Sequence, residues 1–274
     1  MSDPGAAFRA LHRPGDPFIL ANVWDAGTAR LMAGLGAEAL ATASAAHAFT
    51  LGAPDGGNVT RDEALAHAGD IVRATALPVS GDLENGYGRA PEEAARTVRQ
   101  AAVAGLAGCS IEDTDLPGRG AYPFAETVAR IEAAVEAARA LPADFVLCAR
   151  ADGMVTGAYG EEEATRRLKA FVDAGADCVY APGVRDMETV SRLAAAVEAP
   201  LNVLVIGPLT AVPRSEFARA GVARLSLGPA LIRRALAPVI EAGEAMFGRG
   251  DFGVLGAGAS GGDIDALLRI GGAE

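Results

Sequence analysis

Two carboxylates lie two residues apart at the end of a short apolar segment. Residues 80–88 read Ser-Gly-Asp-Leu-Glu-Asn-Gly-Tyr-Gly, which places Asp82 and Glu84 next to a permissive glycine-rich turn. Side chains alternate along a β-strand, so residues two positions apart share one face. Hard cations such as Mg²⁺ prefer carboxylate and water oxygens. The pair is therefore a candidate metal site, although two solvated acids at a strand end would give the same pattern.

The elements that must position these acids alternate between short apolar segments and longer stretches of helical periodicity. Such alternation predicts a parallel sheet, and a count of eight strands predicts an α/β protein with a (β/α)₈ TIM barrel. Residues 1–250 are expected to form this single barrel domain, and residues 251–274 a glycine-rich C-terminal tail with a short extra helix. The predicted strands are residues 18–24, 39–44, 78–84, 108–113, 145–150, 178–182, 201–206 and 224–227.

Composition favours a cytoplasmic protein that binds small molecules. The chain has 274 residues, 50% of them hydrophobic, and a TIM barrel typically needs ~250. No apolar stretch approaches the ~20 residues that span a bilayer, no signal peptide is recognisable, and the three cysteines fit reduced thiols in strands. The net charge of −11 argues against a nucleic-acid partner. It does not exclude an anionic substrate, because a metal and a few arginines can make a site locally positive.

Acidic residues gather at one end of the predicted barrel. The active site of a TIM barrel lies at the carboxyl ends of the strands. Asp82 and Glu84 follow the third strand, Glu112 and Asp113 the fourth, and Asp55 lies in the loop after the second. So many carboxylates would repel one another unless a cation lay among them. This is the strongest argument from the residues alone for a metal.

Other strand ends carry candidate substrate-binding groups. The fifth strand directs Arg150 to the same mouth, where its guanidinium could pair with the acids or bind a carboxylate or phosphoryl group. After the second strand, the Ser44 hydroxyl and nearby backbone N–H groups could hold an anion, or form a turn chosen for packing. His47 could exchange a proton with a substrate or be structural. Trp24 could line the pocket floor or pack in the core.

Taken in order, these motifs resemble the isocitrate lyase and phosphoenolpyruvate mutase superfamily. The resemblance covers roughly residues 8–246. It implies a (β/α)₈ barrel that binds Mg²⁺ or Mn²⁺ and cleaves or forms a bond next to an α-oxo carboxylate through a pyruvate-type enolate. It also implies a homo-oligomer, a dimer or tetramer, in which a C-terminal helix crosses to a neighbour. It rests on Asn-Val-Trp-Asp-Ala at 22–26, Ser44, Leu-Gly-Ala-Pro-Asp at 51–55, Gly-Asp-Leu-Glu-Asn-Gly-Tyr-Gly at 81–88, Ile-Glu-Asp at 111–113, Cys-Ala-Arg at 148–150 and Pro-Leu-Asn-Val at 200–203.

The resemblance assigns metal-binding and catalytic roles residue by residue. Asp82 is similar to the direct metal ligand of the family. Glu84, Glu112 and Asp55 would act directly or through bound water, and Glu84 departs from the Asp that most relatives carry. Arg150 is similar to the arginine that contacts the oxyanion or leaving group. The expected catalytic set is therefore Arg150, Asp82 and Glu112.

The resemblance also implies contacts to a small anionic carboxylate substrate. Ser44 and the backbone amides that follow it resemble the cradle for a pyruvyl carboxylate, although relatives often have glycines after the serine. Asn202 lies where the lyases have an asparagine that reaches the second carboxylate. The expected substrate-binding residues are Ser44, Ala45, Ala46, Trp24, Asn202 and His47.

The loop after the fourth strand departs from the family pattern. Isocitrate and methylisocitrate lyases carry Lys-Lys-Cys-Gly-His there and the phosphonate enzymes a Lys and an Asn, whereas residues 114–123 read Thr-Asp-Leu-Pro-Gly-Arg-Gly-Ala-Tyr-Pro. Arg119 and Tyr122 are candidates for substrate contact or ordinary loop residues. We expect a Mg²⁺-dependent lyase of an α-oxo or hydroxy carboxylate, with decarboxylation or carbon–carbon cleavage favoured. The alternatives are phosphoenolpyruvate mutase-like or phosphonopyruvate hydrolase-like chemistry, and non-catalytic dicarboxylate binding.

Overall fold

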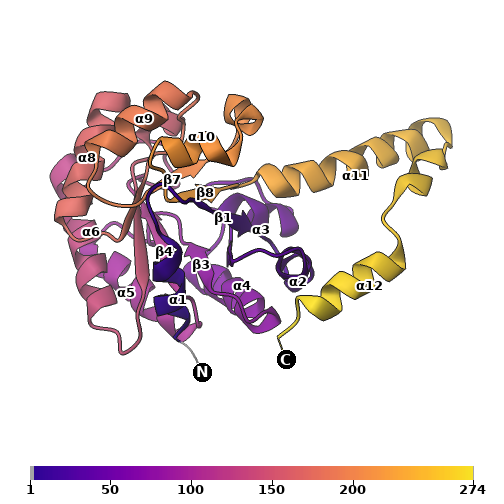
Figure 1. Ribbon diagram of the computed structural model, residues 1–274, viewed down its shortest axis with the longest axis horizontal. Helices are drawn as coiled ribbons and strands as arrows, with labels where there is room; N and C mark the ends of the chain where they lie inside the picture. The colour runs from indigo at the N-terminus through magenta and orange to yellow at the C-terminus, as the bar shows by residue number, and fades with distance from the viewer. Residues whose placement is uncertain (1–2, 274) are drawn as a thin grey trace.

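The strands of this protein close into a parallel barrel. The computed structural model describes residues 3–273. Within them eight strands pair in sequence order, and β8 returns to pair with β1 (Figure 1). The TIM barrel predicted from the sequence is therefore confirmed. The strands are β1 (Phe18–Asn22), β2 (Ala39–Ala41), β3 (Val79–Asp82), β4 (Gly108–Glu112), β5 (Val146–Arg150), β6 (Cys178–Tyr180), β7 (Leu201–Leu204) and β8 (Arg224–Ser226).

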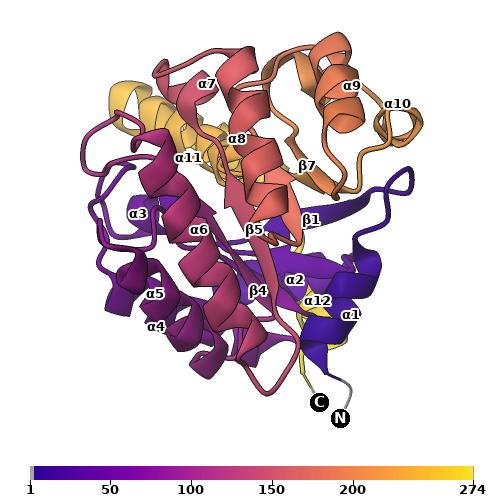
Figure 2. The ribbon, with the colours of Figure 1, turned by 90° about the vertical axis from the view of Figure 1, so that its left-hand side faces the viewer.

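Helices alternate with the strands and cover the outside of the barrel (Figure 2). They are α1 (Pro4–Leu11), α2 (Ala26–Gly34), α3 (Ser44–Thr50), α4 (Arg61–Ala74), α5 (Pro91–Val103), α6 (Phe124–Arg139), α7 (Gly153–Thr156), α8 (Glu161–Asp173), α9 (Met187–Ala196), α10 (Arg214–Arg219), α11 (Ala230–Arg249) and α12 (Gly261–Ile270), with 3₁₀ turns η1 (Gly207–Ala211) and η2 (Gly253–Ala257). The sequence does not predict α1, α3 and α7. Each has at most eight residues, too few to show a clear helical period.

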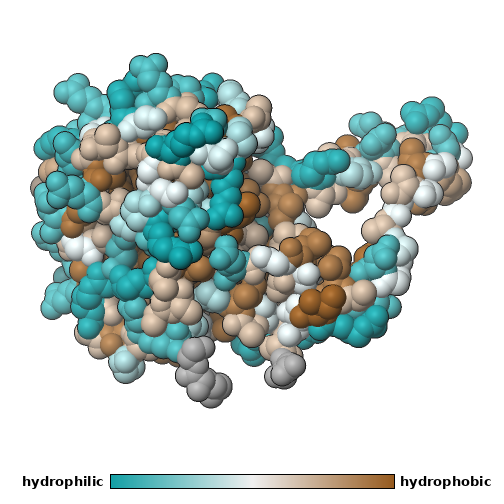
Figure 3. Space-filling model, in the orientation of Figure 1, coloured by the Kyte–Doolittle hydropathy of each residue, from teal (hydrophilic) through white to brown (hydrophobic). Residues whose placement is uncertain are grey.

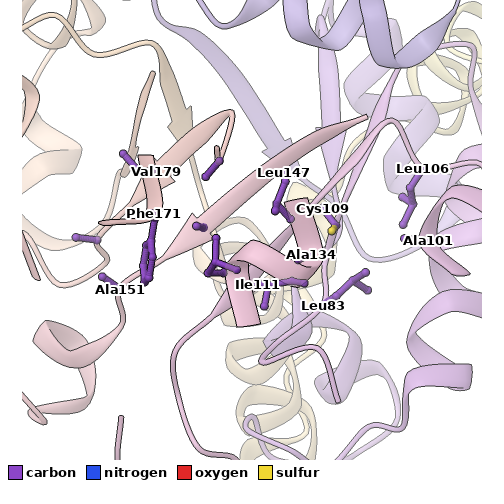
Figure 4. Close-up of a cluster of buried hydrophobic side chains, with 14 of the residues drawn as sticks. Leu83, Ala101, Leu106, Cys109, Ile111, Ala134, Leu147, Ala151, Phe171 and Val179 are labelled. Atoms are coloured by element: carbon purple, nitrogen blue, oxygen red, sulfur yellow. The ribbon is translucent and has the colours of Figure 1, made fainter. Parts of the chain in front are cut away.

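The main hydrophobic core lies between the strands and the helices. Val98 of α5, Ile111 of β4 and Leu147 of β5 are fully buried in it, and Figure 4 shows the last two within this cluster. Because side chains alternate along a strand, the neighbours Ser110 and Glu112 point the other way, into the barrel. The packing of Ile111 outside the barrel thus fixes which residues of β4 reach the interior.

The inside of the barrel is lined by unusually small side chains. TIM barrels are commonly filled by branched residues such as Val, Ile and Leu. Here Ala41 of β2, Ser80 of β3 and Ser110 of β4 line the interior, and a cavity of about 660 Å³ extends down between them. The barrel is therefore hollow at its carboxyl end and partway towards its floor.

The C-terminal helices form an arm that leaves the barrel and returns to it. Helix α11 projects away, and α12 packs against α2 of the same chain (Figure 1). The contact is close, because a Cβ at Gly34 would lie 2.6 Å from the carbonyl oxygen of Leu267. The arm carries exposed apolar side chains, with Phe247 90% exposed. Figure 3 shows hydrophobic surface around the opening between the arm and the barrel.

Exchange of the C-terminal helix between subunits stays a prediction, since α12 lies on its own chain here. Neither the arm nor any other helix in residues 3–273 combines the length and the apolar character needed to cross a membrane.

Candidate active site

The cavity opens at the carboxyl ends of the strands, where the sequence predicts the site. Its walls come from the strand ends and from two loops, residues 54–58 and residues 114–119. The structure brings most of the expected residues together there. Those lining the cavity are Ser44, Ala45, Asp55, Asp82, Glu84, Glu112, Arg150 and Asn202.

Arg150 lies at the centre of an ion-pair network. Its Nη1 is 2.7 Å from Oδ1 of Asp82, and its Nη2 is 3.0 Å from Oε2 of Glu112 and 2.7 Å from Oδ2 of Asp152. Its guanidinium also lies 5.2 Å from the ring centroid of Tyr180. Asp82 ends β3, Glu112 ends β4 and Asp152 follows β5, so the barrel itself sets this geometry.

Burial and charge act in opposite directions on this network. Burial alone would lower the pKa of Arg150, but Asp152, Glu112 and Asp82 outweigh it and hold the pKa well above its ordinary value. Burial raises the pKa of Glu112 well above its usual range, and the charge of Asp152 adds to the rise, while Arg150 opposes it. The network therefore concentrates acids around a single cation.

Asp82 is held from its other side by Ser44. The backbone N–H and the hydroxyl of Ser44 each donate a hydrogen bond to Oδ2 of Asp82, both at 2.9 Å. The hydroxyl of Ser110 lies 3.4 Å from Oδ1. Asp82 is thereby fixed at the end of β3, with both oxygens engaged.

Glu84 reaches the same cavity by a different route from the predicted one. Strand β3 ends at Asp82, so Glu84 lies beyond it, in a left-handed backbone conformation with φ 46°. Its Oε1 accepts a hydrogen bond of 3.1 Å from the backbone N–H of Gly57. Burial raises the pKa of Glu84 to about 7. Burial also raises the pKa of Asp55, and the charge of Asp82 adds to this rise.

The carboxylates fit a cation that keeps part of its water shell. Among residues 3–273, no three His, Cys, Asp or Glu side chains are grouped closely enough to enclose a metal ion by themselves. Magnesium is commonly held by one or two carboxylates and retains several waters. Asp82, Asp55 and Glu84 line one cavity, and the charge of Asp82 helps to raise the pKa of both Asp55 and Glu84, a repulsion that a divalent cation would relieve. The donor set therefore fits magnesium or manganese held partly through water.

Three of the expected substrate-binding residues do not line the cavity. Ala46 and Trp24 pack with Ala43 and Ile232 in a small cluster beside it. His47 stacks on His67, with ring centroids 3.8 Å apart. Burial, together with the neighbouring His67, lowers the pKa of His47 to about 4. The structure thus places these residues behind Ser44 rather than in the cavity wall.

The predicted residue Asn202 contacts two polar residues of the barrel interior that the sequence does not single out, Arg224 and Ser226. Asn202 of β7 donates from Nδ2 to the hydroxyl of Ser226 at 2.9 Å, and its Oδ1 accepts from Nε of Arg224 at 2.9 Å. Ser226, Arg224 and Tyr180 all line the cavity. The alternation Arg-Leu-Ser in the predicted eighth strand was the signal that could have found Arg224 and Ser226.

Asp113 corrects the expectation that five acids meet at the mouth. It follows Glu112 directly and points away from the cavity, as strand alternation requires. Its Oδ1 accepts from the backbone N–H of Asp152 at 2.8 Å, and its Oδ2 from Nη1 of Arg167 at 2.8 Å and from the hydroxyl of Tyr159. Asp113 therefore supports the site from behind.

The loop after β4 presents only one of its two candidate residues to the cavity. Arg119 lines it, whereas the hydroxyl of Tyr122 accepts a hydrogen bond from Nδ2 of Asn85 at 3.0 Å, outside the cavity. The Tyr122 ring is covered by the guanidinium of Arg130, 4.5 Å from its centroid. The part of the loop at the cavity thus carries no side chain that normally exchanges protons near neutral pH.

Known proteins share both the sequence and the fold. The oxaloacetate decarboxylase of Chromohalobacter salexigens is 36% identical over 222 residues, covering 78% of this chain and 75% of the relative. A solved structure from Burkholderia cenocepacia J2315, described only as a lyase/mutase, superposes with a TM-score of 0.90 at 47% identity and covers 95% of this chain and 94% of the other. A structure of oxaloacetate acetylhydrolase in complex with its product oxalate gives a TM-score of 0.85 at 28% identity, covering 97% and 94%.

A family model described as phosphoenolpyruvate phosphomutase matches residues 8–247. This match spans nearly all of the barrel and includes every residue of the Arg150 network. The chain therefore belongs to the phosphoenolpyruvate mutase/isocitrate lyase superfamily, as its motifs predict.

Proposed function

We propose that this protein is a Mg²⁺- or Mn²⁺-dependent lyase that acts next to a small α-oxo or hydroxy carboxylate, by carbon–carbon cleavage or decarboxylation. One observation carries the proposal. Asp82, Ser44 and Arg150 meet in one cavity, whereas the adjoining loop offers no general acid or base. Oxaloacetate is the first substrate to test, because it is the substrate that two similar proteins carry in their names.

Decarboxylation is the carbon–carbon cleavage that needs the fewest proton-transfer residues. The electron pair of the breaking bond moves towards the oxo oxygen and gives an enolate, CO₂ leaves, and a proton then adds to the enolate carbon. No base is needed to start the reaction, and the leaving group needs no proton. A site without a proton-transfer residue in its loop can therefore perform this reaction, whereas lyases that first deprotonate a hydroxyl need such a residue.

The side chains of the cavity would orient the substrate and stabilise the developing charge. The guanidinium of Arg150, 2.7 Å from Asp82, would place positive charge beside the developing oxyanion of a substrate bound at Asp82. Ser44 and the neighbouring backbone would hold the pyruvyl carboxylate. A divalent cation held by Asp82, with Glu84, Glu112 and Asp55 directly or through water, would supply further positive charge there.

The test measures pyruvate and CO₂ released from oxaloacetate, methylisocitrate and phosphonopyruvate, with Mg²⁺ and with chelator. Oxaloacetate decarboxylates slowly with Mg²⁺ alone, so protein-free reactions set the baseline. Asp82→Ala should abolish the protein-dependent rate. Asp70→Ala is the matched control, because Asp70 lies on the exposed face of α4, 67% exposed, and pairs only with Arg73.

The possible outcomes separate the candidate functions. Chelator-sensitive pyruvate release from a diacid, lost in Asp82→Ala, supports the lyase. Turnover of phosphonopyruvate alone would point to phosphorus–carbon chemistry. Binding of oxalate without turnover of any of the three substrates would favour a substrate outside this panel or a non-catalytic dicarboxylate-binding protein over the reaction proposed.

We also propose that the protein is a cytoplasmic homo-oligomer, a dimer or tetramer, and the exposed apolar arm supports the oligomeric part of this proposal. The exposed side chains on α11 and η2 would be covered in such an assembly. They are Leu236, Val239, Ile240, Phe247 and Leu255. Mass measurement in solution tests this, and a monomer at micromolar concentration would refute it.

A further inference from the structure

A buried arginine lies in the cavity wall, deeper in the barrel than the Arg150 network. Arg224 is the first residue of β8, is 2% exposed and lines the cavity. A guanidinium stays protonated in proteins, so this is a permanent positive charge inside the barrel. The catalytic scheme above makes no use of it.

None of the hydrogen-bond partners of Arg224 in residues 3–273 is a carboxylate. Its Nε donates to Oδ1 of Asn202 at 2.9 Å, its Nη2 to Sγ of Cys148 at 2.9 Å, and its Nη1 lies 3.1 Å from Nε2 of His12. The residues that the structure describes give it no salt bridge to a carboxylate, whereas Arg150 has three. A buried charge is costly unless an opposite charge pairs with it.

The space beside Arg224 is polar and connected to the active site. Ser80, Ser110 and Ser226 line the same cavity, where TIM barrels usually carry branched apolar residues. Arg224 contacts Cys148, which lies two residues before Arg150 on β5. The Arg224 guanidinium therefore lies deeper in the barrel than Arg150 by the length of two strand residues. At ~3.3 Å per residue this is about 6.6 Å.

We propose that Arg224 is a specificity-determining residue that binds a second carboxylate of the substrate, remote from the bond that breaks. The inference rests on the proposed function and narrows its substrate class. A carboxylate that leaves as CO₂ loses its charge in the transition state, so a cation bound to it would slow the reaction. Arg224 is therefore suited to a carboxylate that the product keeps. The preferred substrate is longer than oxaloacetate. Its second carboxylate lies ~6.6 Å, the length of two strand residues, from the end at which the bond breaks.

Binding of matched oxo acids to the Mg²⁺-loaded protein tests the inference. Calorimetry would compare 2-oxoglutarate with 2-oxopentanoate, and 2-oxoadipate with 2-oxohexanoate, since the members of each pair differ in the distal carboxylate. A hydrogen-bonded charge pair should make at least one diacid bind about 10- to 100-fold more tightly than its partner. Arg224→Gln should bring this ratio close to one while leaving the affinity of the monoacid unchanged, and Arg224→Lys should keep part of the ratio.

Two controls identify the source of any change. Cys148→Ser should retain the ratio; a ratio close to one in the native protein that rises in Cys148→Ser would mean that the Cys148 thiolate, rather than the ligand, neutralises Arg224, and would overturn the assignment. Circular dichroism checks that the Arg224 variants are folded, and if they are not, the ratio in the native protein still decides.

Oxalate reports on the reacting end of the site independently. If oxalate binds with Mg²⁺ but the diacids gain nothing over the monoacids, the assignment of Arg224 is overturned and the proposed function stands. If oxalate does not bind, the proposed function fails and this inference fails with it.

Discussion

Replacement of Asp113 by alanine should destabilise the protein far more than loss of an exposed aspartate. The Asp113 side chain is fully buried, and its ion-pair partner Arg167 is 6% exposed. The substitution leaves the Arg167 guanidinium buried with only Glu163 as an acidic partner, 2.9 Å from its Nε. It also leaves the backbone N–H of Asp152 and the hydroxyl of Tyr159 without their acceptor.

The expected magnitude follows from these contacts. Removing one member of a buried ion pair typically costs about 3–5 kcal/mol, because the other charge stays buried. A change of 1 kcal/mol shifts the melting temperature of a domain of this size by about 2–4 °C, so Asp113→Ala should lower it by roughly 6–20 °C. Asp113→Asn should cost less, because an amide oxygen can still accept from Asp152.

Denaturant titration and thermal melting would measure the change. Asp70→Ala is the matched control, since it removes an Asp–Arg pair whose side chains are 67% and 71% exposed and should cost less than about 1 kcal/mol. If Asp113→Ala were no less stable than Asp70→Ala, buried charge would not hold this part of the barrel together, and the reasoning would be refuted.

Three further predictions follow from other contacts. Ser44→Ala removes the hydroxyl hydrogen bond to Asp82, and kcat/KM for the substrate found should fall about 10- to 100-fold, as loss of a bond to a charged group implies. Burial, with the charge of Arg224 adding to it, lowers the pKa of His12 from 6.5 to about 3. Between pH 6.5 and about 3, His12 takes up a proton in the unfolded chain but not in the folded protein. The free energy of unfolding is therefore highest above pH 6.5 and decreases as pH falls towards 3, by on the order of a few kcal/mol. His12→Gln should show a smaller decrease when the free energy of unfolding is measured against pH. Gly34→Ala should detach α12, because its Cβ would meet the carbonyl oxygen of Leu267 at 2.6 Å. Gly27→Ala in the same helix meets only a side chain at 3.5 Å and should leave α12 docked, and protease digestion of the arm distinguishes the two.

The sequence predicts the barrel well because its signals are local and repeated. Strand alternation correctly directs Arg150 and Glu112 into the barrel. The same rule, applied strictly, would also have turned Asp113 away from the mouth. That expectation failed because it grouped acids by strand end and disregarded the side to which each one points.

Other parts of the site depend on contacts that no local pattern encodes. His47 lies one helical turn after Ser44, yet its ring stacks on His67 of α4 rather than facing the cavity. Glu84 reaches the cavity only because the chain adopts a left-handed conformation after β3. The partners of Arg224 come from β5, β7 and the end of α1. Only the assembled fold therefore shows that none of them is a carboxylate.

The start of α11 connects the arm directly to the cavity. Gly228 and Pro229 line the cavity, and Ile232, one turn into the helix, packs against Ala43 and Ala46 beside Ser44. If neighbouring subunits hold the arm, they also hold this wall, and specific activity becomes a function of protein concentration. Dilution below the dissociation constant of the assembly would then lower the turnover per subunit without any change in the residues that touch the substrate.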